Sequence, residues 1–203
     1  GVPLGVACAA FIAIFVPRRA GMVLKPAIEL LAGIPSVVYG FLGVMWLAPI
    51  IRDRFGGPGL SILAASCVLA IMILPTIVSV SIDAINAVPK SYREGSLALG
   101  ATEWQTAWRV TLPAARSGIL AGVILGMGRA VGETMAVIMI SGNATQIPHS
   151  IFDSVRTLTA NIAIEMGYAV GEHREALFAT GVVLFFFIMM LNVVALRVSR
   201  RKF

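Results

Sequence analysis

The chain has 203 residues, of which 58% are hydrophobic and only 13% are charged. In soluble domains about a quarter of the residues are charged, so this composition excludes a water-soluble globular protein and indicates that lipid surrounds the chain. The net charge of +6 does not indicate nucleic-acid binding, because the basic residues lie between apolar runs and not on one amphipathic face. We therefore predict an all-α membrane protein that has no nucleic-acid partner.

Five apolar runs follow one another along the chain. The first covers residues 1–16 and opens without a methionine, which we interpret as a piece of a longer chain with at least one span upstream. The others cover residues 27–51, 60–82, 113–141 and 175–198. One helical span takes about 20 apolar residues. The sequence thus predicts a polytopic bundle of about five transmembrane helices in a single domain over residues 1–203.

Glycine and proline interrupt several of these runs. Pro35 and Gly40 are expected to kink or loosen the second span. The small residues Gly118, Gly122 and Gly126 recur at every fourth position of the fourth span and predict close packing against a neighbouring helix. Glu29 lies in the second span near its cytoplasmic start, where a carboxylate is expected to complement the helix N-terminus.

The basic residues are unevenly shared between alternate connections, and this bias predicts the orientation. One set of connections holds eleven of the 16 lysines and arginines and the other holds four. Because cytoplasmic loops carry the excess of positive charge, we place the first set and the C-terminus in the cytoplasm. The larger set is Arg18, Arg19, Lys25, Lys90, Arg93, Arg109, Arg116, Arg197, Arg200, Arg201 and Lys202, and the smaller is Arg52, Arg54, Arg156 and Arg174.

Two connections are longer than turns. Residues 142–174, predicted to be extracytoplasmic, show an apolar periodicity that suggests a short helix through Ile151, Val155, Leu158 and Ile162. Residues 83–113, predicted to be cytoplasmic, hold two short helices over 90–99 and 101–110, separated at Gly100. We call residues 83–113 the elbow.

The elbow carries apolar side chains that are expected to be buried against a partner or lipid. Leu97, Leu99, Trp104 and Trp108 are expected to be exposed or half-exposed there. A ridge that docks a cytosolic partner explains them, and so does an interfacial loop whose tryptophans lie at the lipid headgroups. Composition alone leaves both interpretations open.

The spacing of residues within the elbow resembles the EAA loop of ABC-importer permeases. The match runs from Glu94, Gly95 and Ser96 through Gly100 to Val110, Leu112 and Pro113. It departs from the family where Gly95 and Ser96 replace alanines, although both are small. The resemblance implies a coupling helix that sits in a cleft of an ATP-binding subunit, and so favours docking. The residues assigned to this contact are Glu94, Gly95, Ser96, Leu97, Ala98, Leu99, Gly100, Ala101, Leu112 and Pro113.

No residue pattern for catalysis or metal binding accompanies these features. The chain holds no G-x-x-x-x-G-K-[ST] loop, so ATP would be hydrolysed on a different polypeptide. His149 and His173 lack further ligands at suitable spacing, and Cys8 and Cys67 lie in separate apolar runs. We predict a transport subunit that has no enzymatic activity and binds no cofactor or metal.

Arg129 and Glu133 lie near the middle of the fourth run. An ionisable group at that depth costs about 2.5 to more than 10 kcal/mol and usually marks a pathway or a pair. Their spacing of four would place both side chains on one helical face, where they form a neutral pair or serve an anion path. In the second case Arg129 would bind an oxyanion bidentately and Glu133 would moderate its pull. Thr134, and less directly Ser141 and Asn143, would add polar contacts.

The segment RAVGETMAV, followed by SGN, resembles the phosphate-specific permeases of ABC importers, and of the two paired permeases it is more similar to the PstC type. ELLAGIPSVVYGFLG and LPTIVSVSIDAINAVP are similar to the same family. The resemblance implies the MetI-like fold of binding-protein-dependent transport inner-membrane components, here the type I importer permease fold. It also implies a second, PstA-like permease, ATP-binding subunits, an extracytoplasmic phosphate-binding protein and a bacterial cytoplasmic membrane.

Other functions remain open from the residues themselves. Sulfate, molybdate or phosphonate would suit the same arginine as phosphate does. An ion-coupled secondary transporter or channel, with Arg129 and Glu133 as a gate or proton relay, fits broken spans and a charge within the membrane equally well. A membrane enzyme is less well supported, since no nucleophile, metal set or carboxylate pair lies at a membrane surface.

Overall fold

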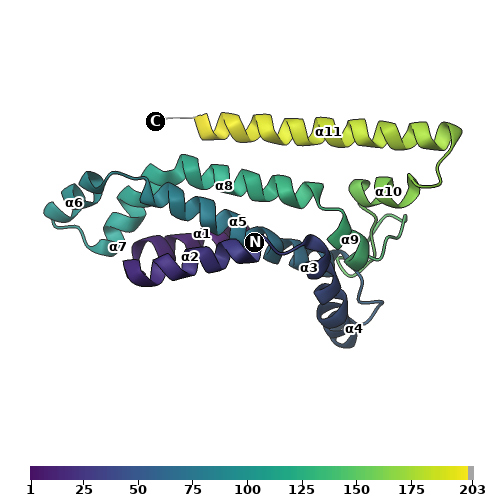
Figure 1. Cartoon of the computed structure of the whole chain (residues 1–203), viewed down its shortest axis with the longest axis horizontal. Helices are drawn as coiled ribbons and strands as arrows, with labels where there is room; N and C mark the ends of the chain where they lie inside the picture. The colour runs from purple at the N-terminus through teal and green to yellow at the C-terminus, as the bar shows by residue number, and fades with distance from the viewer. Residues whose placement is uncertain (201–203) are drawn as a thin grey trace. The chain divides into compact units, whose positions relative to one another are not determined.

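The computed structural model describes residues 1–200, without the side chains of Arg18, Ala195, Leu196, Val198, Ser199 and Arg200. The predicted cytoplasmic charges Arg201 and Lys202 therefore lie outside the described residues. Helices form all the regular elements of that part, and the one isolated bridge joins Gly142 to Val155 (Figure 1). In chain order the helices are α1 (Val2–Ile14), α2 (Arg18–Ala32), α3 (Ser36–Leu42), η1 (Gly43–Leu47), α4 (Ala48–Phe55), α5 (Ile62–Asn86), α6 (Lys90–Ala98), α7 (Glu103–Thr106), η2 (Ala107–Thr111), α8 (Leu112–Gly132), α9 (Met135–Ile140), α10 (Leu158–Glu165) and α11 (Gly171–Arg200).

Four helical segments are long and apolar enough to cross a membrane. They are Ser36–Phe55, Ile62–Asn86, Glu103–Gly132 and Gly171–Val194, and the shorter apolar helix α1 precedes them. The predicted class, a polytopic α-helical membrane protein, is confirmed. The first of the five expected spans has only 13 helical residues within this chain.

The second span begins later than predicted. The sequence suggested one run over residues 27–51, but α2 ends at Ala32 and α3 begins at Ser36, so the kink expected at Pro35 is a complete break. The residue before a proline avoids helical dihedrals, which ends a helix at this point. Glu29 consequently lies in the last turn of α2 and complements no helix N-terminus. Its carboxylate instead accepts a hydrogen bond of 3.0 Å from the Ser79 hydroxyl.

The predicted bounds of the fourth span are also wrong at both ends. Its helix is continuous from Glu103 to Gly132, so Pro113 opens no new span, and it stops well before the predicted end at residue 141. Pro113 lacks the N–H that an α-helix needs, and the π-helical turn η2 immediately precedes α8. At the other end the chain leaves the helix at Glu133 and Thr134 before α9 begins.

The helices gather into two compact units. The first holds Gly1–Gly33, Ile73–Met127 and the C-terminal part from Asn192. Its core joins α1, α5 and α8 through Ala9, Val78, Ile82, Ala115 and Ile119. The glycine face of α8 lies against α5, because a Cβ at Gly126 would come within 2.7 Å of Ile77 and one at Gly122 within 3.1 Å of Val80. The predicted close packing of this face is confirmed.

The second unit holds Ile34–Met72 and Gly128–Leu191. Here α3 and α9 approach so closely that a Cβ at Gly40 would lie 2.8 Å from the backbone Cα of Ala136. Next to this contact, Ala48, Ile51, Val68 and Ile140 form a buried core. Gly40 is thus a contact residue between two helices and does not loosen its span.

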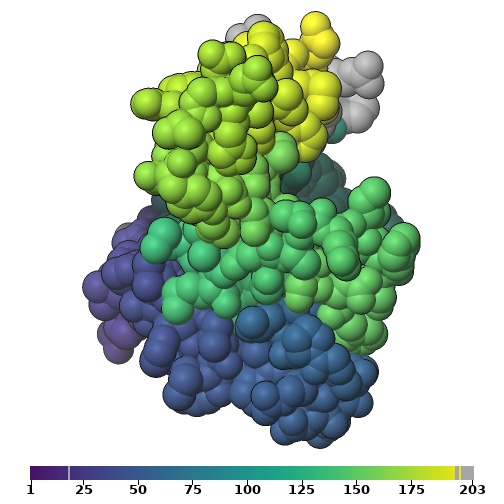
Figure 2. Space-filling model, turned by 90° about the vertical axis from the view of Figure 1, so that its right-hand side faces the viewer, coloured from purple at the N-terminus to yellow at the C-terminus, as the bar shows by residue number. Residues whose placement is uncertain are grey.

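The outer connection and the part of α11 up to Leu191 complete the second unit. The helix predicted through Ile151 and Val155 is confined to α10, and residues 141–157 form a looped segment without a helix. Leu177 of α11 is buried, but most of the large side chains that follow it are exposed, among them Phe185 at 63% and Phe186 at 57%. The residues of α11 lie at the surface in the yellow-green region of Figure 2. Such an apolar helix surface is suited to lipid or to another membrane helix.

Candidate functional site

The first helix predicted in the elbow is present as α6, whereas the second, predicted over 101–110, begins at Glu103 and continues into α8. α6 ends at Ala98, and Gly100 adopts a φ of +86°, a left-handed conformation that glycine enters without strain. The Gly100 N–H donates to the Leu97 carbonyl at 2.9 Å, and the Ala101 N–H donates to the Ser96 carbonyl at 3.2 Å. This hydrogen-bonded glycine turn closes α6 and sets the direction of α7.

Hydrogen bonds between side chains fix the elbow further. Thr102 caps α7 by accepting from the Gln105 N–H, and the Gln105 side chain accepts from the Thr102 N–H in return. The hydroxyls of Ser96 and Thr106 lie 2.9 Å apart, and Arg93 pairs with Glu103 at 2.5 Å. The turn between α6 and α7 is therefore shaped by its own residues.

The predicted coupling residues differ in their exposure. Leu99 is 91% exposed, and none of the α6 residues is fully buried. Of the other assigned positions, Glu94, Gly95, Ala98, Gly100 and Pro113 are exposed, Ser96, Leu97 and Ala101 are half-buried, and Leu112 packs partly against the core of the first unit. Leu112 is thus in part a structural residue.

The two tryptophans lie together on the second half of the elbow. Their ring centroids are 5.7 Å apart, and Phe15 lies at the same distance from Trp104. Trp104 and Trp108 nevertheless remain 58% and 57% exposed. This aromatic surface fits a partner protein or the lipid headgroup region, as the sequence suggested.

Arg129 and Glu133 do not share one helix, as their spacing had suggested. Arg129 lies half-buried in the last turn of α8, and Glu133 lies beyond the helix end. The Glu133 carboxylate accepts a 3.0 Å hydrogen bond from the Ala136 N–H in the first turn of α9, and its backbone carbonyl accepts from the Thr159 hydroxyl at 3.1 Å. A cation at a helix C-terminus and a carboxylate at a helix N-terminus both complement the helix dipole.

The space beside this break is open. A Cβ at Gly128 or Gly132 would meet no atom within 4 Å, so these glycines leave room beside Arg129. Thr134 is half-buried and its hydroxyl donates to the Gly132 carbonyl at 3.2 Å, bridging the break.

Ser141 and Asn143 close the far end of α9. The Ser141 hydroxyl donates to the Asn143 amide oxygen at 3.2 Å, and the Asn143 amide nitrogen donates to the Ile138 carbonyl at 2.7 Å. Asn143 has a φ of +55°, which is typical of a residue that follows a helix C-terminus. Both side chains are thus engaged in local structure.

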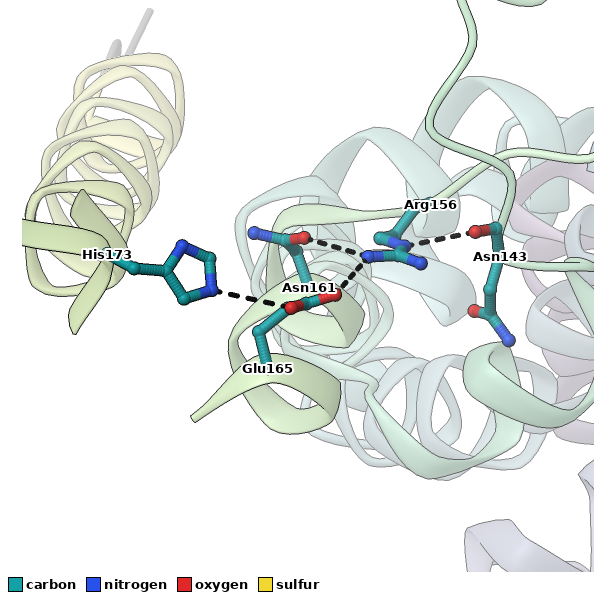
Figure 3. Close-up of polar contacts among 5 residues, drawn as sticks. All are labelled: Asn143, Arg156, Asn161, Glu165 and His173. Atoms are coloured by element: carbon teal, nitrogen blue, oxygen red, sulfur yellow. Dashed lines mark hydrogen bonds and ion pairs between the residues drawn. The ribbon is translucent and has the colours of Figure 1, made fainter. Parts of the chain in front are cut away.

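A charged network in the outer connection was not expected from the sequence (Figure 3). The Arg156 guanidinium donates to the Asn143 carbonyl at 3.0 Å and pairs with Glu165 at 2.6 Å. The other carboxylate oxygen of Glu165 lies 3.4 Å from the His173 ring nitrogen on α11. Hydrogen bonds from Tyr168, then Arg156, lower the pKa of Glu165 below its usual value. The network joins the loop, α10 and α11, which no periodicity could have indicated.

An ion pair near the predicted cytoplasmic side was also missed. Lys25 of α2 pairs with Asp83 of α5 and lies 3.8 Å from Glu29. The hydrogen bond to Asp83 raises the pKa of Lys25. The residues are 58 positions apart in sequence, so the pairing depends on the fold.

Comparisons with known proteins agree with this architecture. The family model described as "Binding-protein-dependent transport system inner membrane component" matches residues 1–203. The chain is 47% identical to the probable ABC transporter permease protein YqgH of Bacillus subtilis over 98% of its length, and 38% identical to the phosphate transport system permease protein PstC of Mesorhizobium japonicum over 96%. It spans 66% of the length of each relative. It is also 37% identical to PstC of Xylella fastidiosa, covering 99% of the chain and 69% of the relative.

Solved structures share the fold at low sequence identity. The MetNI methionine ABC transporter, in inward-facing conformations, aligns with a TM-score of 0.70 at 20% identity, over 98% of this chain and 84% of that one. A bacterial ABC transporter involved in alginate import gives a TM-score of 0.70 at 16% identity, over 99% and 73% of the two chains. With four helices able to span a membrane and a family model matched from end to end, the chain belongs to the inner membrane components of binding-protein-dependent transport systems.

Proposed function

We propose that this chain is a permease subunit of an ATP-driven importer and carries inorganic phosphate across the bacterial cytoplasmic membrane. The observation that carries the proposal is the break after α8, where Arg129 lies in the last turn of the helix beside the open positions of Gly128 and Gly132. The names of the PstC relatives support phosphate as the transported anion.

The residues at the break suit the transient binding of an oxyanion. A guanidinium stays protonated at any relevant pH and binds phosphate oxygens bidentately. Glu133 places a negative charge nearby while holding the first turn of α9. A carboxylate near the arginine would weaken its hold on the anion, and conduction requires that the anion leave again. Thr134 offers a hydroxyl at the same break.

The elbow is the proposed contact with an ATP-binding subunit. Its turn is fixed by local hydrogen bonds, while Leu99 is left almost fully exposed. A fixed shape with an uncovered apolar tip suits rigid transmission of movement from a partner. ATP would be hydrolysed on that partner, because this chain has no phosphate-binding loop.

The complete importer would hold further subunits. We propose a second, PstA-like permease, a pair of ATP-binding subunits and an extracytoplasmic phosphate-binding protein, with the elbow and the C-terminus of this chain in the cytoplasm. The permease itself would bind no cofactor and perform no covalent chemistry.

Uptake of labelled phosphate tests the role of Arg129. In membranes that contain all the subunits, Arg129→Ala should abolish ATP-dependent uptake while leaving assembly intact. Arg129→Lys, which keeps the charge without the planar fork, should retain part of the uptake. Arg54→Ala removes an exposed cation outside the break and serves as the control. Normal uptake by Arg129→Ala at normal membrane levels would refute the anion path.

The same membranes distinguish the substrates and the energy source. Excess unlabelled phosphate should compete with the labelled anion, whereas sulfate, molybdate and a phosphonate should not. Uptake should stop when the ATP-binding subunits are omitted. Uptake driven by an ion gradient without those subunits would instead support a secondary transporter.

A further inference from the structure

A cavity of about 740 Å³ opens within the first unit, at the end of the helices where the elbow begins. It is lined by the end of α1, the middle of α2, the end of α5 and the start of α6. Its walls divide by chemistry. Ile12, Val16, Met22 and Ile82 are apolar, whereas Lys90 and Arg93 of α6 are cationic.

The cationic side of the cavity has an unmatched positive charge. Lys25 also lines it but is paired with Asp83, and Arg93 is paired through one nitrogen with Glu103. Within residues 1–200, Lys90 has no ion pair, and no carboxylate is among the lining residues. The Arg93 nitrogens that are not paired with Glu103 lie on the same short helix as Lys90, α6.

The open surface next to the cavity is apolar. On α2, Met22, Val23 and Leu30 are 62%, 71% and 77% exposed, although the same helix carries Arg19 and Lys25. Helices that combine exposed apolar residues with lysine and arginine lie in the headgroup region of a bilayer. The cavity is therefore placed where a lipid headgroup and the first part of its acyl chains would meet the protein.

We propose that this cavity binds an anionic phospholipid of the cytoplasmic leaflet, with its phosphodiester at Lys90 and Arg93 and its acyl chains along the apolar wall. The inference depends on the orientation given under the proposed function, which places the elbow in the cytoplasm. It depends on neither phosphate transport nor Arg129. Basic pockets between membrane helices on this side suit anionic headgroups, and polybasic segments there are attracted to anionic lipids.

Free inorganic phosphate shares the headgroup chemistry but fits the cavity less well. A small, strongly hydrated anion gains nothing from Ile12, Val16, Met22 and Ile82, and burying its oxygens against them would cost free energy. A lipid with one negative charge matches the single unmatched cation and also covers the apolar wall.

Lipid retention by the purified, assembled complex tests the proposal. The complex would be extracted from vesicles of phosphatidylglycerol and phosphatidylcholine, and the retained lipids counted by native mass spectrometry. Phosphatidylglycerol should be retained over phosphatidylcholine, and Lys90→Ala should lower its retention about fivefold. Arg109→Ala, an exposed elbow cation that does not line the cavity, should leave retention unchanged.

A second variant acts on the apolar side without changing any charge. Gly21 lines the cavity, and a Cβ there would meet no atom within 4 Å, so Gly21→Leu would add an apolar side chain to its wall. It should also lower phosphatidylglycerol retention, and millimolar inorganic phosphate should not displace the lipid. Displacement by phosphate would overturn the lipid assignment in favour of a free anion. Equal retention by wild type, Lys90→Ala and Gly21→Leu would overturn the site, whatever the outcome of the uptake assay.

Discussion

The elbow and the contact between α3 and α9 are ordered by opposite means. In the elbow, the glycine turn at Gly100 and the cap at Thr102 give the chain its course, and no residue of α6 is fully buried. Between α3 and α9, the fit of Gly40 against the backbone of Ala136 matters most, and several neighbours are completely buried. A surface shaped by its own hydrogen bonds can remain uncovered until a partner binds, whereas a backbone contact is lost when the helices separate.

The comparison predicts that Gly40 tolerates no side chain. In Gly40→Ala, the new Cβ would lie 2.8 Å from the Ala136 Cα and 3.2 Å from its carbonyl oxygen. Backbone atoms cannot turn aside as a flexible side chain does, so we expect a loss of about 1–3 kcal/mol in the free energy of unfolding. Thermal unfolding in detergent measures the loss.

Gly128→Ala is the matched control for Gly40. Its Cβ would meet no atom within 4 Å, so the substitution should keep or raise stability through the better helix propensity of alanine. Equal stability of the Gly40 and Gly128 variants would contradict the proposed importance of the close contact.

A smaller loss of stability is expected in the elbow. Gly100→Ala forces a Cβ into a conformation with a φ of +86°, which costs about 1–2 kcal/mol, although nothing lies within 4 Å of the new atom. A turn of different conformation would also move Leu99, so less of the ATP-binding subunit should co-purify with the variant.

Gly95→Ala separates strain from position in the elbow. Gly95 is helical, and as at Gly100 a Cβ there would meet no atom within 4 Å. Its alanine variant should therefore gain about 0.5–1 kcal/mol in the free energy of unfolding. If both variants bound the ATP-binding subunit normally, the shape of the turn would not control docking.

The sequence predicted the features that depend on local chemistry. The length of the apolar runs predicted the helical class. Gly100 predicted the turn in the elbow, because a left-handed residue after a short helix is a local requirement. The glycine spacing on α8 predicted a packing face, because small residues four positions apart lie on one side of a helix and let a neighbour approach. The orientation and the anion path at Arg129 stay predictions.

Helix breaks and ion pairs that depend on the fold were harder to predict from the sequence. Apolar residues continue on both sides of Gly132, Glu133 and Thr134, so the end of α8 was missed. A glycine followed by an acidic residue and threonine nevertheless combines helix-stop and helix-start signals. The pairing of Lys25 with Asp83 joins distant segments, and no pattern in a single sequence records it.

The network of Arg156, Glu165 and His173 orders the outer connection by ion pairs, a third means beside local hydrogen bonds and close helix contacts. We expect its effect on stability to be the smallest of the three. Hydrogen bonds from Tyr168 and Arg156 lower the pKa of Glu165, so its contribution to stability is present above the unfolded pKa near 4.5 and is lost as the pH falls through the lower folded value. Glu165→Gln removes this titration, and thermal unfolding in detergent at pH 7 and pH 3.5 should therefore show a smaller acid-induced loss than in wild type. Glu172→Gln, which removes an exposed carboxyl outside the network, controls for general acid effects. A wild-type and a Glu165→Gln protein with identical pH dependence would mean that the Glu165 carboxylate adds no pH-dependent stability to this unit.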